Sequence, residues 1–228
     1  MSKGFVIAID GPVAAGKGTI SPILAENLNG FYLYTGAMYR CLAFLCIKSG
    51  IDATDESAVV NILPEFKINV SDNKVFLNGE DVTERIKGED VAMAASKVAV
   101  IKKVREEMVS IQQEIANKLI DEGKIVIAEG RDTATRVFPN AKLKIFLTAT
   151  PEVRTKRRLL QIEKRGEKAE FEYVLKDVKL RDEQDSEREI DPLVKNPQAF
   201  GYFVLNDSEM SEEETIRIII KEVEKIKQ

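Results

Sequence analysis

Short apolar runs, rich in β-branched and aromatic residues, recur along the chain and are separated by stretches with helical periodicity. The runs lack strict alternation of apolar and polar residues, as is typical of strands buried on both faces of a sheet. Strands that alternate with helices predict an α/β fold with a five-stranded parallel sheet flanked by helices. The expected strands are Phe5–Ile9, Phe31–Tyr34, Lys124–Ala128, Leu143–Leu147 and Tyr202–Leu205.

The expected helices begin at recognisable signals. Thr150 before Pro151 has the order of an N-cap and a first-turn proline, and Ser211 with Glu214 fits a capping box. Each of these pairs therefore predicts a helix that begins there. The other helical patterns begin near Gly16 and cover residues 36–49 and 101–122.

Two segments interrupt the alternation of strands and helices. Within residues 64–83, apolar residues alternate around Asp72-Asn73, and Asn78-Gly79 supplies a second turn signal, which predicts a small antiparallel insert. Residues 154–188 are almost continuously helical and charged, with one break near Arg165-Gly166, which predicts a helical lid. We expect a single domain, with its core in residues 1–50, 101–153 and 189–228, an insert over about 51–100 and a lid over about 154–188.

Composition excludes several kinds of function. The chain has no histidine, which removes Ser-His and Cys-His nucleophile pairs and imidazole acid–base chemistry. Two cysteines, Cys41 and Cys46, cannot form a structural zinc site alone and are expected to be inert core thiols. The longest stretch without a charge, Asn27–Tyr39, has 13 residues and is too short to span a bilayer. With no signal-peptide pattern at the start, we expect a cytoplasmic protein without a membrane partner.

Arginines are concentrated in one part of the chain. Eight of the twelve lie between residues 131 and 188, where they and seven lysines face eleven acidic residues, a net charge of +4. The whole chain has a net charge of −4, which argues against nucleic acid as a partner. Because arginine suits bidentate phosphate contacts, the local excess favours a compact polyphosphate ligand. The alternative is a solvated, salt-bridged pair of helices.

The first expected strand runs directly into a glycine-rich loop that opens a helix. Such a loop holds phosphates with its backbone N–H groups and the helix N-terminus, and its lysine, Lys17, would reach the outer phosphates. The alternative, an ordinary strand-to-helix turn, leaves Lys17 unexplained. The place where Ser or Thr usually approaches magnesium is occupied by a glycine, so the metal ligands stay open. The loop consists of Gly11, Pro12, Val13, Ala14, Ala15, Gly16, Lys17, Gly18 and Thr19.

A phosphate site in a chain without histidine favours phosphoryl transfer. An acceptor that is itself a phosphate is already largely ionised at neutral pH, so the reaction needs no general base. It does need cations around two phosphates brought together in line. An arginine-rich lid could supply those cations.

Five further motifs accompany the loop. Together with the loop they resemble bacterial cytidylate kinases, nucleoside monophosphate kinases with a P-loop NTPase-type fold, and the resemblance is collinear over nearly all of residues 4–220. The motifs are Thr35–Arg40 (Thr-Gly-Ala-Met-Tyr-Arg), Asn78–Thr83, Ala94–Ala99 with Val104-Arg105, Glu129–Asp132 with Val137–Pro139, and Arg181–Arg188 with Pro192-Leu193.

This resemblance implies ATP-dependent phosphorylation of CMP and dCMP with Mg²⁺, within pyrimidine nucleotide metabolism, by a monomer. The ATP phosphates would be bound by Gly11 to Thr19, with Arg157 beside the donor nucleotide, and catalysis would rest on Lys17, Arg131, Arg181 and Arg188. The CMP phosphate and the transferring group would be surrounded by Arg40, Arg131, Arg181 and Arg188. The cytosine and sugar would face Thr35, Ser96, Arg105, Asp132 and Asp185. A surface ion pair is the alternative, above all for Arg154, Arg158 and Arg165.

Three positions depart from the family pattern. Tyr34 replaces an aspartate, Ala134 replaces a glycine and Arg136 replaces an apolar residue. Ala134 would strain a tight turn that needs a positive φ. Two other functions stay open: a kinase for UMP or AMP, and a nucleotide-binding regulatory module without catalysis.

Overall fold

The computed structural model describes residues 3–71 and 74–227, and the chain divides into two compact units. One unit contains residues 1–32 and 116–228, and the other contains residues 33–115. The boundaries fall within β2 (Phe31–Tyr34) and α5 (Lys102–Asp121). The lid predicted over about 154–188 lies within the first unit, and the insert predicted over about 51–100 lies within the second.

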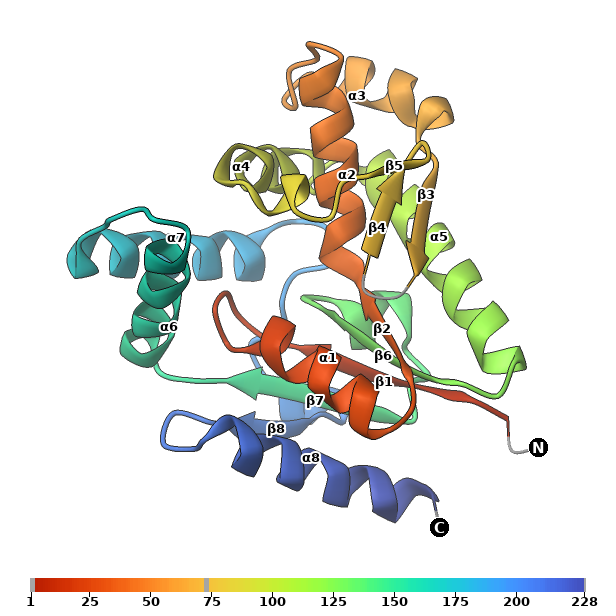
Figure 1. Cartoon of the computed structure of the whole chain (residues 1–228), viewed down its shortest axis with the longest axis vertical. Helices are drawn as coiled ribbons and strands as arrows, with labels where there is room; N and C mark the ends of the chain where they lie inside the picture. The colour runs from red at the N-terminus through yellow and green to blue at the C-terminus, as the bar shows by residue number, and fades with distance from the viewer. Residues whose placement is uncertain (1–2, 72–73, 228) are drawn as a thin grey trace. The chain divides into compact units, whose positions relative to one another are not determined.

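The five-stranded sheet confirms the predicted fold class. Its strand order is β2-β6-β1-β7-β8, so β1 lies between two neighbours (Figure 1). Ile7 of β1 pairs in parallel with Ile127 of β6 and with Leu143 of β7. The carboxyl ends of parallel strands meet at one edge of a sheet, which is where ligands bind in such folds. The strands are β1 (Phe5–Asp10), β6 (Ile125–Gly130), β7 (Leu143–Thr148) and β8 (Phe203–Asn206).

Two helices cover one side of this sheet and pack against each other, α1 (Lys17–Asn27) and α8 (Glu212–Lys227). Their buried residues Ile20, Leu24 and Ile219 pack with strand residues such as Ile9 and Ile145, all 2% exposed or less. Burying such side chains contributes roughly 1.5–3 kcal/mol each. The capping box predicted before α8 is present. Ser211 N donates to Glu214 Oε2 at 2.9 Å, and Glu214 N donates to Ser211 Oγ at 3.2 Å.

The segment predicted as a helical lid contains α6 (Pro151–Lys164) and α7 (Phe171–Glu187). Thr150 caps α6, because its side chain accepts from the Val153 N–H at 3.4 Å. The two helices pack against each other (Figure 1). The break between them contains Gly166, whose φ of 79° suits glycine. This unit also holds a short π-helix, η3 (Thr133–Val137), and a 3₁₀ turn, η4 (Pro197–Phe200).

The unit of residues 33–115 contains the predicted antiparallel insert. Its small sheet has the order β3-β4-β5, and Asn78 and Gly79 turn the chain between β4 and β5 with positive φ. The turn predicted at Asp72-Asn73 lies outside the described residues. The strands are β3 (Ile68–Ser71), β4 (Lys74–Leu77) and β5 (Glu80–Asp81).

Helix α2 (Thr35–Lys48) packs against α4 (Glu89–Val98) in the same unit. Cys41 and Cys46 of α2 are buried free thiols, as predicted, and burial raises the pKa of Cys41 to about 12. None of the helices in residues 3–71 and 74–227 has the length and apolar character needed to cross a membrane. The remaining helices are α3 (Glu56–Ile62), η1 (Leu63–Glu65) and η2 (Arg85–Lys87).

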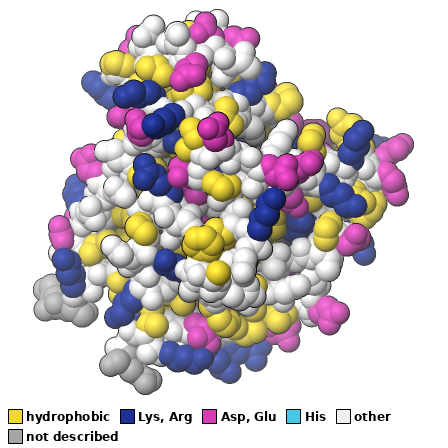
Figure 2. Space-filling view, turned by 180° about the vertical axis from the view of Figure 1, so that it is seen from behind, with side chains coloured by type: hydrophobic (Ala, Val, Ile, Leu, Met, Phe, Trp, Pro, Cys, Tyr) yellow, Lys and Arg dark blue, Asp and Glu magenta, His cyan; other side chains and the backbone are white. Residues whose placement is uncertain are grey.

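Positive and negative side chains are interspersed over the face drawn in Figure 2. Ion pairs such as Lys48–Glu80 and Lys87–Glu84 have side chains that are more than half exposed. Exposed pairs contribute little to stability, because water and salt screen them.

Candidate active site

The loop between β1 and α1 contains three residues with a positive φ. A Cβ on Gly11 would lie 2.0 Å from the backbone oxygen of Leu147, so no larger residue fits there. Gly16, with a φ of 91°, is the N-cap of α1. Ala14 between them has a φ of 57°, which residues with a side chain rarely adopt. The surroundings must therefore hold this loop in place.

Lys17, the first residue of α1, is buried and turned back onto its own loop. Its Nζ donates to Gly11 O at 2.7 Å and to Pro12 O at 2.9 Å. Burial, and next the nearby charge of Arg131, lower the pKa of Lys17 to about 7, against the opposing effect of acids that include Glu129. The ammonium group is thus held at the loop by exchangeable hydrogen bonds, where an incoming phosphate could bind it.

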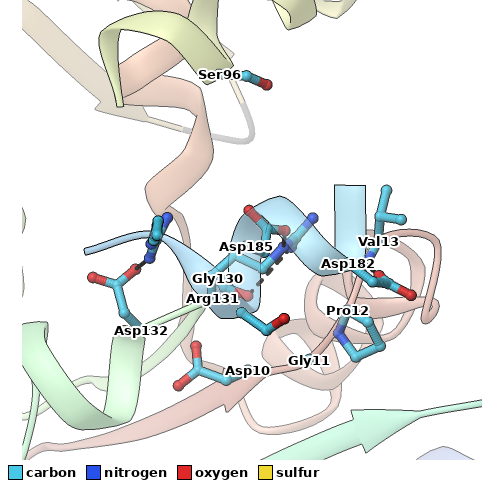
Figure 3. Close-up of polar contacts among 12 residues, drawn as sticks. Asp10, Gly11, Pro12, Val13, Ser96, Gly130, Arg131, Asp132, Asp182 and Asp185 are labelled. Atoms are coloured by element: carbon cyan, nitrogen blue, oxygen red, sulfur yellow. Dashed lines mark hydrogen bonds and ion pairs between the residues drawn. The ribbon is translucent and has the colours of Figure 1, made fainter. Parts of the chain in front are cut away.

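Asp10, the last residue of β1, fixes the segment that follows β6. It is fully buried, and its carboxylate accepts from the Thr133 and Ala134 N–H groups, both at 2.8 Å. The Tyr202 hydroxyl donates a third hydrogen bond to it at 2.6 Å. These contacts hold the start of η3, directly after Asp132. Figure 3 shows where Asp10 and Asp132 lie.

Two arginine–carboxylate pairs lie at the same edge of the sheet. Arg131 Nε donates to Asp185 Oδ2 at 2.6 Å, and the two side chains point toward each other (Figure 3). Arg188 NH2 lies 3.2 Å from Asp132 Oδ1, with both side chains only 11–12% exposed. Arg188 also donates to the backbone oxygen of Asp191. The structure thus brings together Lys17 and four residues predicted to bind substrate.

Electrostatics link these groups. Burial by itself would raise the pKa of Asp185, but Arg131, Arg188 and Lys17 outweigh it and hold that pKa below its usual value. Asp185 is therefore a carboxylate near neutral pH. Arg181 was also predicted to surround the transferring group. Its Nε lies 3.1 Å from Oδ2 of Asp177, one turn earlier in α7.

The base of the lid contacts the loop directly. Arg154 is 4% exposed, which rules out the surface ion pair considered for it. Its NH1 donates to Val13 O at 3.0 Å, and its NH2 lies 2.6 Å from Asp182 Oδ2. One turn later, Arg157 NH1 donates to Ala15 O at 3.3 Å and pairs with Asp207 at 2.9 Å.

Arg158 and Arg165 differ from Arg154, because both make contacts with nearby lid residues. Arg158 NH1 donates to Gln161 Oε1 at 3.3 Å. Arg165 Nε lies 3.1 Å from Glu167 Oε1, in a pair whose side chains are 30% and 55% exposed. The surface-pair interpretation therefore holds for Arg165.

The other predicted substrate contacts lie in the unit of residues 33–115. Thr35 begins α2 and is 5% exposed, and Arg40 NH1 donates to Ile86 O at 2.8 Å. Ser96 Oγ donates to Ala92 O at 3.2 Å. Arg105 NH1 donates to Ala99 O at 3.1 Å, and its guanidinium lies 5.7 Å from the centre of the Tyr39 ring.

A hollow of about 860 Å³ in the same unit is separate from all of these residues. It lies against the small sheet and is lined by residues such as Lys67, Asn69, Phe76 and Asn78. None of the predicted site residues lines it. The chemistry is therefore assigned by the charged groups described above and not by the size of a hollow.

Comparison with known proteins is decisive at this point. A family model for cytidylate kinase matches residues 7–225. The cytidylate kinase of Caldicellulosiruptor bescii is 42% identical over 223 residues, which cover 96% of this chain and 95% of that protein. That of Clostridioides difficile is 45% identical over 190 residues, which cover 83% and 86%. The chain belongs to the cytidylate kinase family.

Membership of the cytidylate kinase family confirms the resemblance and the predicted activity. The chain is a nucleoside monophosphate kinase that phosphorylates CMP with ATP. Solved structures support the fold alone. A protein from Eubacterium ventriosum has a TM-score of 0.55 at 12% identity, covering 96% of this chain and 98% of its own. TT1252 from Thermus thermophilus has a TM-score of 0.50 at 18% identity, covering 97% and 98%.

The three departures from the cytidylate kinase pattern cause no visible conflict. Ala134 lies in η3 with a φ that is not positive, so the strain expected there is absent. Arg136 forms an ion pair with Asp191, with 3.7 Å between Nε and Oδ2. The Tyr34 ring covers Gly36, where a Cβ would lie 2.7 Å from it, so a larger residue there would require the ring to move.

Several side chains that contact the loop or the segment after β6 are not among the predicted site residues. Asp10, Asp182 and Tyr202 were not among the predicted site residues, and Arg154 was weighed as a surface residue. Two signals were available. Asp10 directly precedes the glycine-rich loop, and Asp182 lies inside the Arg181–Arg188 motif.

Proposed function

We propose that phosphoryl transfer takes place at the carboxyl ends of β1 and β6, with the loop Gly11–Thr19 on the donor side. The observation that supports it best is the group of charges around the Lys17 ammonium. Arg131, Glu129, Asp10 and Asp185 are all close enough to shift its pKa. Such a group holds cations and acids near a loop whose N–H groups can receive phosphate.

In the proposed reaction, an oxygen of the CMP phosphate forms a bond to the γ-phosphorus of ATP. The bond from that phosphorus to the β,γ-bridging oxygen breaks, and ADP leaves with the electron pair. Lys17, Arg131, Arg181 and Arg188 neutralise the charge on the transferring group. The acceptor phosphate is already ionised, which agrees with the absence of histidine from the chain.

Arg157 is proposed to lie beside the donor nucleotide. Its contacts with Ala15 O and Asp207 place it at the loop. On the acceptor side, Asp132 and Asp185 are proposed to accept from the cytosine amine or the ribose hydroxyls, as carboxylates can. The corresponding roles of Thr35, Arg40, Ser96 and Arg105 stay predictions from the family resemblance.

The chain's residues fit Mg²⁺ carried by ATP better than a resident metal. No three acidic or cysteine side chains in the described part of the chain form a metal-binding group. Asp10 already accepts three hydrogen bonds. Glu129 Oε1 accepts from the Tyr32 hydroxyl at 2.6 Å and lies 3.5 Å from where a Cβ on Gly18 would be. Mg²⁺ on the phosphates would neutralise their charge, with Glu129 available to its bound water.

Release of ADP, measured with CMP, dCMP, UMP, AMP or no acceptor, tests the proposed function. We expect rapid release with CMP and dCMP, slow release with UMP and AMP, and little hydrolysis of ATP alone, because lid closure excludes water. Equal release with and without an acceptor would contradict the proposal. A monomeric state and a cytoplasmic location are further proposals that this assay leaves untouched.

A further inference from the structure

The peptide group of Val13, in the middle of the phosphate loop, is held on both of its polar sides. Its N–H donates to Asp182 Oδ1 at 3.3 Å, and its carbonyl oxygen accepts from Arg154 NH1 at 3.0 Å. The ring is closed by the ion pair between Arg154 NH2 and Asp182 Oδ2, at 2.6 Å. Figure 3 shows Asp182 beside Val13. We call Arg154, Asp182 and the Val13 peptide the loop clamp.

The loop clamp uses every nitrogen of the Arg154 guanidinium. The third nitrogen, Nε, donates to Ala149 O at 3.0 Å, just before α6 begins. The side chain is 5% exposed. A buried guanidinium with three well-placed acceptors in a planar fork is a rigid connection, which a lysine could not reproduce. Arg154 therefore joins the end of β7, the loop and α7 at one point.

The residue next to the clamp carries the strain of the loop. Ala14 has a φ of 57°, and residues with a side chain keep such a conformation only where their surroundings enforce it. The carbonyl of Val13 is held by Arg154 on one side of Ala14, and that of Ala15 by Arg157 on the other. Arg154 and Arg157 thus hold the carbonyl groups on both sides of the strained residue.

The clamp also fixes α7 relative to the loop. Asp182 follows Arg181 directly and precedes Asp185 by three residues, so Asp182 and Asp185 lie on the same side of the helix. Asp182 contacts the loop, and Asp185 contacts Arg131. The clamp thus links the loop to α7, while Asp185 has its own pair with Arg131.

We propose that Arg154 and Asp182 are positioning residues for phosphoryl transfer, which hold the Val13 peptide and so preset the loop for the phosphates of ATP. Neither needs to touch a substrate. This inference rests on the proposed role of the Gly11–Thr19 loop in donor binding, and it adds the two side chains that keep the loop ready.

The test compares Asp182→Asn and Arg154→Met with two matched variants. Glu183→Gln removes one negative charge from the exposed neighbouring position, and Lys156→Met removes one positive charge from an exposed position on α6. We expect both clamp variants to raise KM for ATP about tenfold and to change KM for CMP less than twofold. The matched variants should leave both constants unchanged.

Two further variants separate positioning from simple stabilisation. Arg154→Lys keeps the charge but reaches fewer acceptors, so its KM for ATP should lie between those of the wild type and Arg154→Met. The double variant Asp182→Asn with Arg154→Met should be no worse than the poorer single variant, because both break the same ring. If Asp182→Asn does not fold, Arg154→Lys and Asp182→Glu carry the test with both charges retained, and each must raise KM for ATP.

Lys17→Met, measured in parallel, distinguishes failure of this inference from failure of the proposed site. If Lys17→Met loses turnover while folded clamp variants keep the wild-type KM for ATP, the clamp has no positioning role. Equal rises in KM for ATP and CMP would also overturn the inference. If Lys17→Met keeps normal turnover, the loop itself is not the donor site, and the inference fails with it.

Discussion

The phosphate loop is held by side chains that form hydrogen bonds with its backbone, whereas the arginine cluster is built on pairs between side chains. Arg154 and Asp182 hold the Val13 peptide, and Asp10 holds the N–H groups of Thr133 and Ala134. The arginine cluster instead consists of the pairs Arg131–Asp185 and Arg188–Asp132. Its guanidinium groups are therefore paired with carboxylates, in addition to the hydrogen bonds that Arg188 and Arg131 donate to the backbone oxygens of Asp191 and Gly130.

This difference determines what a substrate has to displace. In the proposed site, the Val13 peptide keeps Arg154 and Asp182 as partners when phosphates bind, and Lys17 exchanges its bonds to Gly11 O and Pro12 O for the phosphates. The carboxylates of the arginine cluster occupy guanidinium donors that a phosphate would also use, so binding exchanges one anion for another. Removing one partner of a pair as little exposed as Arg188–Asp132 leaves the other unpaired, which is costly. The loop is therefore proposed to have its binding shape before phosphates bind. The arginines of the cluster are proposed to exchange a carboxylate partner for a phosphate.

The largest expected effect comes from the one side chain at the loop whose hydrogen bonds are exchangeable. Lys17→Met should lower kcat by about 10²–10³-fold, because it removes the positive charge that is proposed to neutralise the transferring phosphoryl group. The fold should survive, since only two hydrogen bonds to loop carbonyls are lost. Steady-state kinetics and a melting curve measure both quantities. Lys118→Met, at an exposed position of α5, is the control, and near-normal turnover of Lys17→Met would reject the role of Lys17.

A smaller effect, confined to the acceptor, should follow from changes in the arginine cluster. Asp132→Ala or Asp185→Ala should raise KM for CMP roughly tenfold, and KM for ATP much less, since each removes a proposed contact with CMP. Each change also releases an arginine, Arg188 or Arg131, from its pair. Initial rates over a grid of both substrates give the two constants. A rise of the same size in both would show that the cluster does not distinguish acceptor from donor.

Local sequence patterns predicted most of the fold. The strand Phe31–Tyr34 has the predicted bounds, and the helix expected over 101–122 is α5, from Lys102 to Asp121. Thr150 and the Ser211–Glu214 pair cap their helices as expected. These signals act between residues a few positions apart, so a single sequence shows them. The π-helix η3 has no comparable local signal, because the residue that holds it, Asp10, lies far away in the sequence at the end of β1.

The site was harder to predict, because its supporting contacts join distant parts of the chain. Asp10 and Thr133 are 123 positions apart, and Val13 and Asp182 are 169 apart. No periodicity or spacing relates such residues. The phosphate loop could be found because its chemistry lies in nine consecutive residues. The residues that hold the loop could be found only once the folded chain brought them together.

A change at Tyr202 tests, with a smaller expected effect, how Asp10 holds the backbone N–H groups of Thr133 and Ala134. Its hydroxyl donates to Asp10, and its ring packs edge-on against Phe146 with centroids 5.8 Å apart. Burial, and next the charge of Asp10, raise the pKa of Tyr202, so it stays protonated and keeps donating. Tyr202→Phe retains the ring contact and should cost about 1–2 kcal/mol of unfolding free energy.

Denaturant unfolding of Tyr202→Phe measures that loss, and Tyr173→Phe, at a residue 75% exposed, is the control. Asp10 keeps its two backbone hydrogen bonds in the variant, so Asp132 should move little and KM for CMP should change no more than a few-fold. A loss of stability no greater than that of Tyr173→Phe would mean that the third hydrogen bond does not help to hold η3.

The smallest effect concerns a proton on Lys17. Its pKa is lowered to about 7 in the folded chain, mainly by burial, from an ordinary value of 10.5. Between these values the unfolded chain binds more protons than the folded one, so the contribution of Lys17 to stability rises with pH across that window. A polyphosphate beside the ammonium favours its charged form. ATP binding near pH 7.5 should therefore take up a fraction of a proton, up to about three quarters.

Calorimetry of ATP binding in two buffers with different ionisation enthalpies measures this uptake. Lys17→Met should reduce the uptake, whereas Lys118→Met should leave it unchanged, and ATP's own protons contribute equally in all three proteins. The comparison also sharpens the contrast between loop and cluster. Asp185, whose pKa is held low by Arg131, Arg188 and Lys17, is already charged at this pH and has no proton to exchange. If Lys17→Met and the wild type take up the same amount, the exchangeable proton does not reside at the loop.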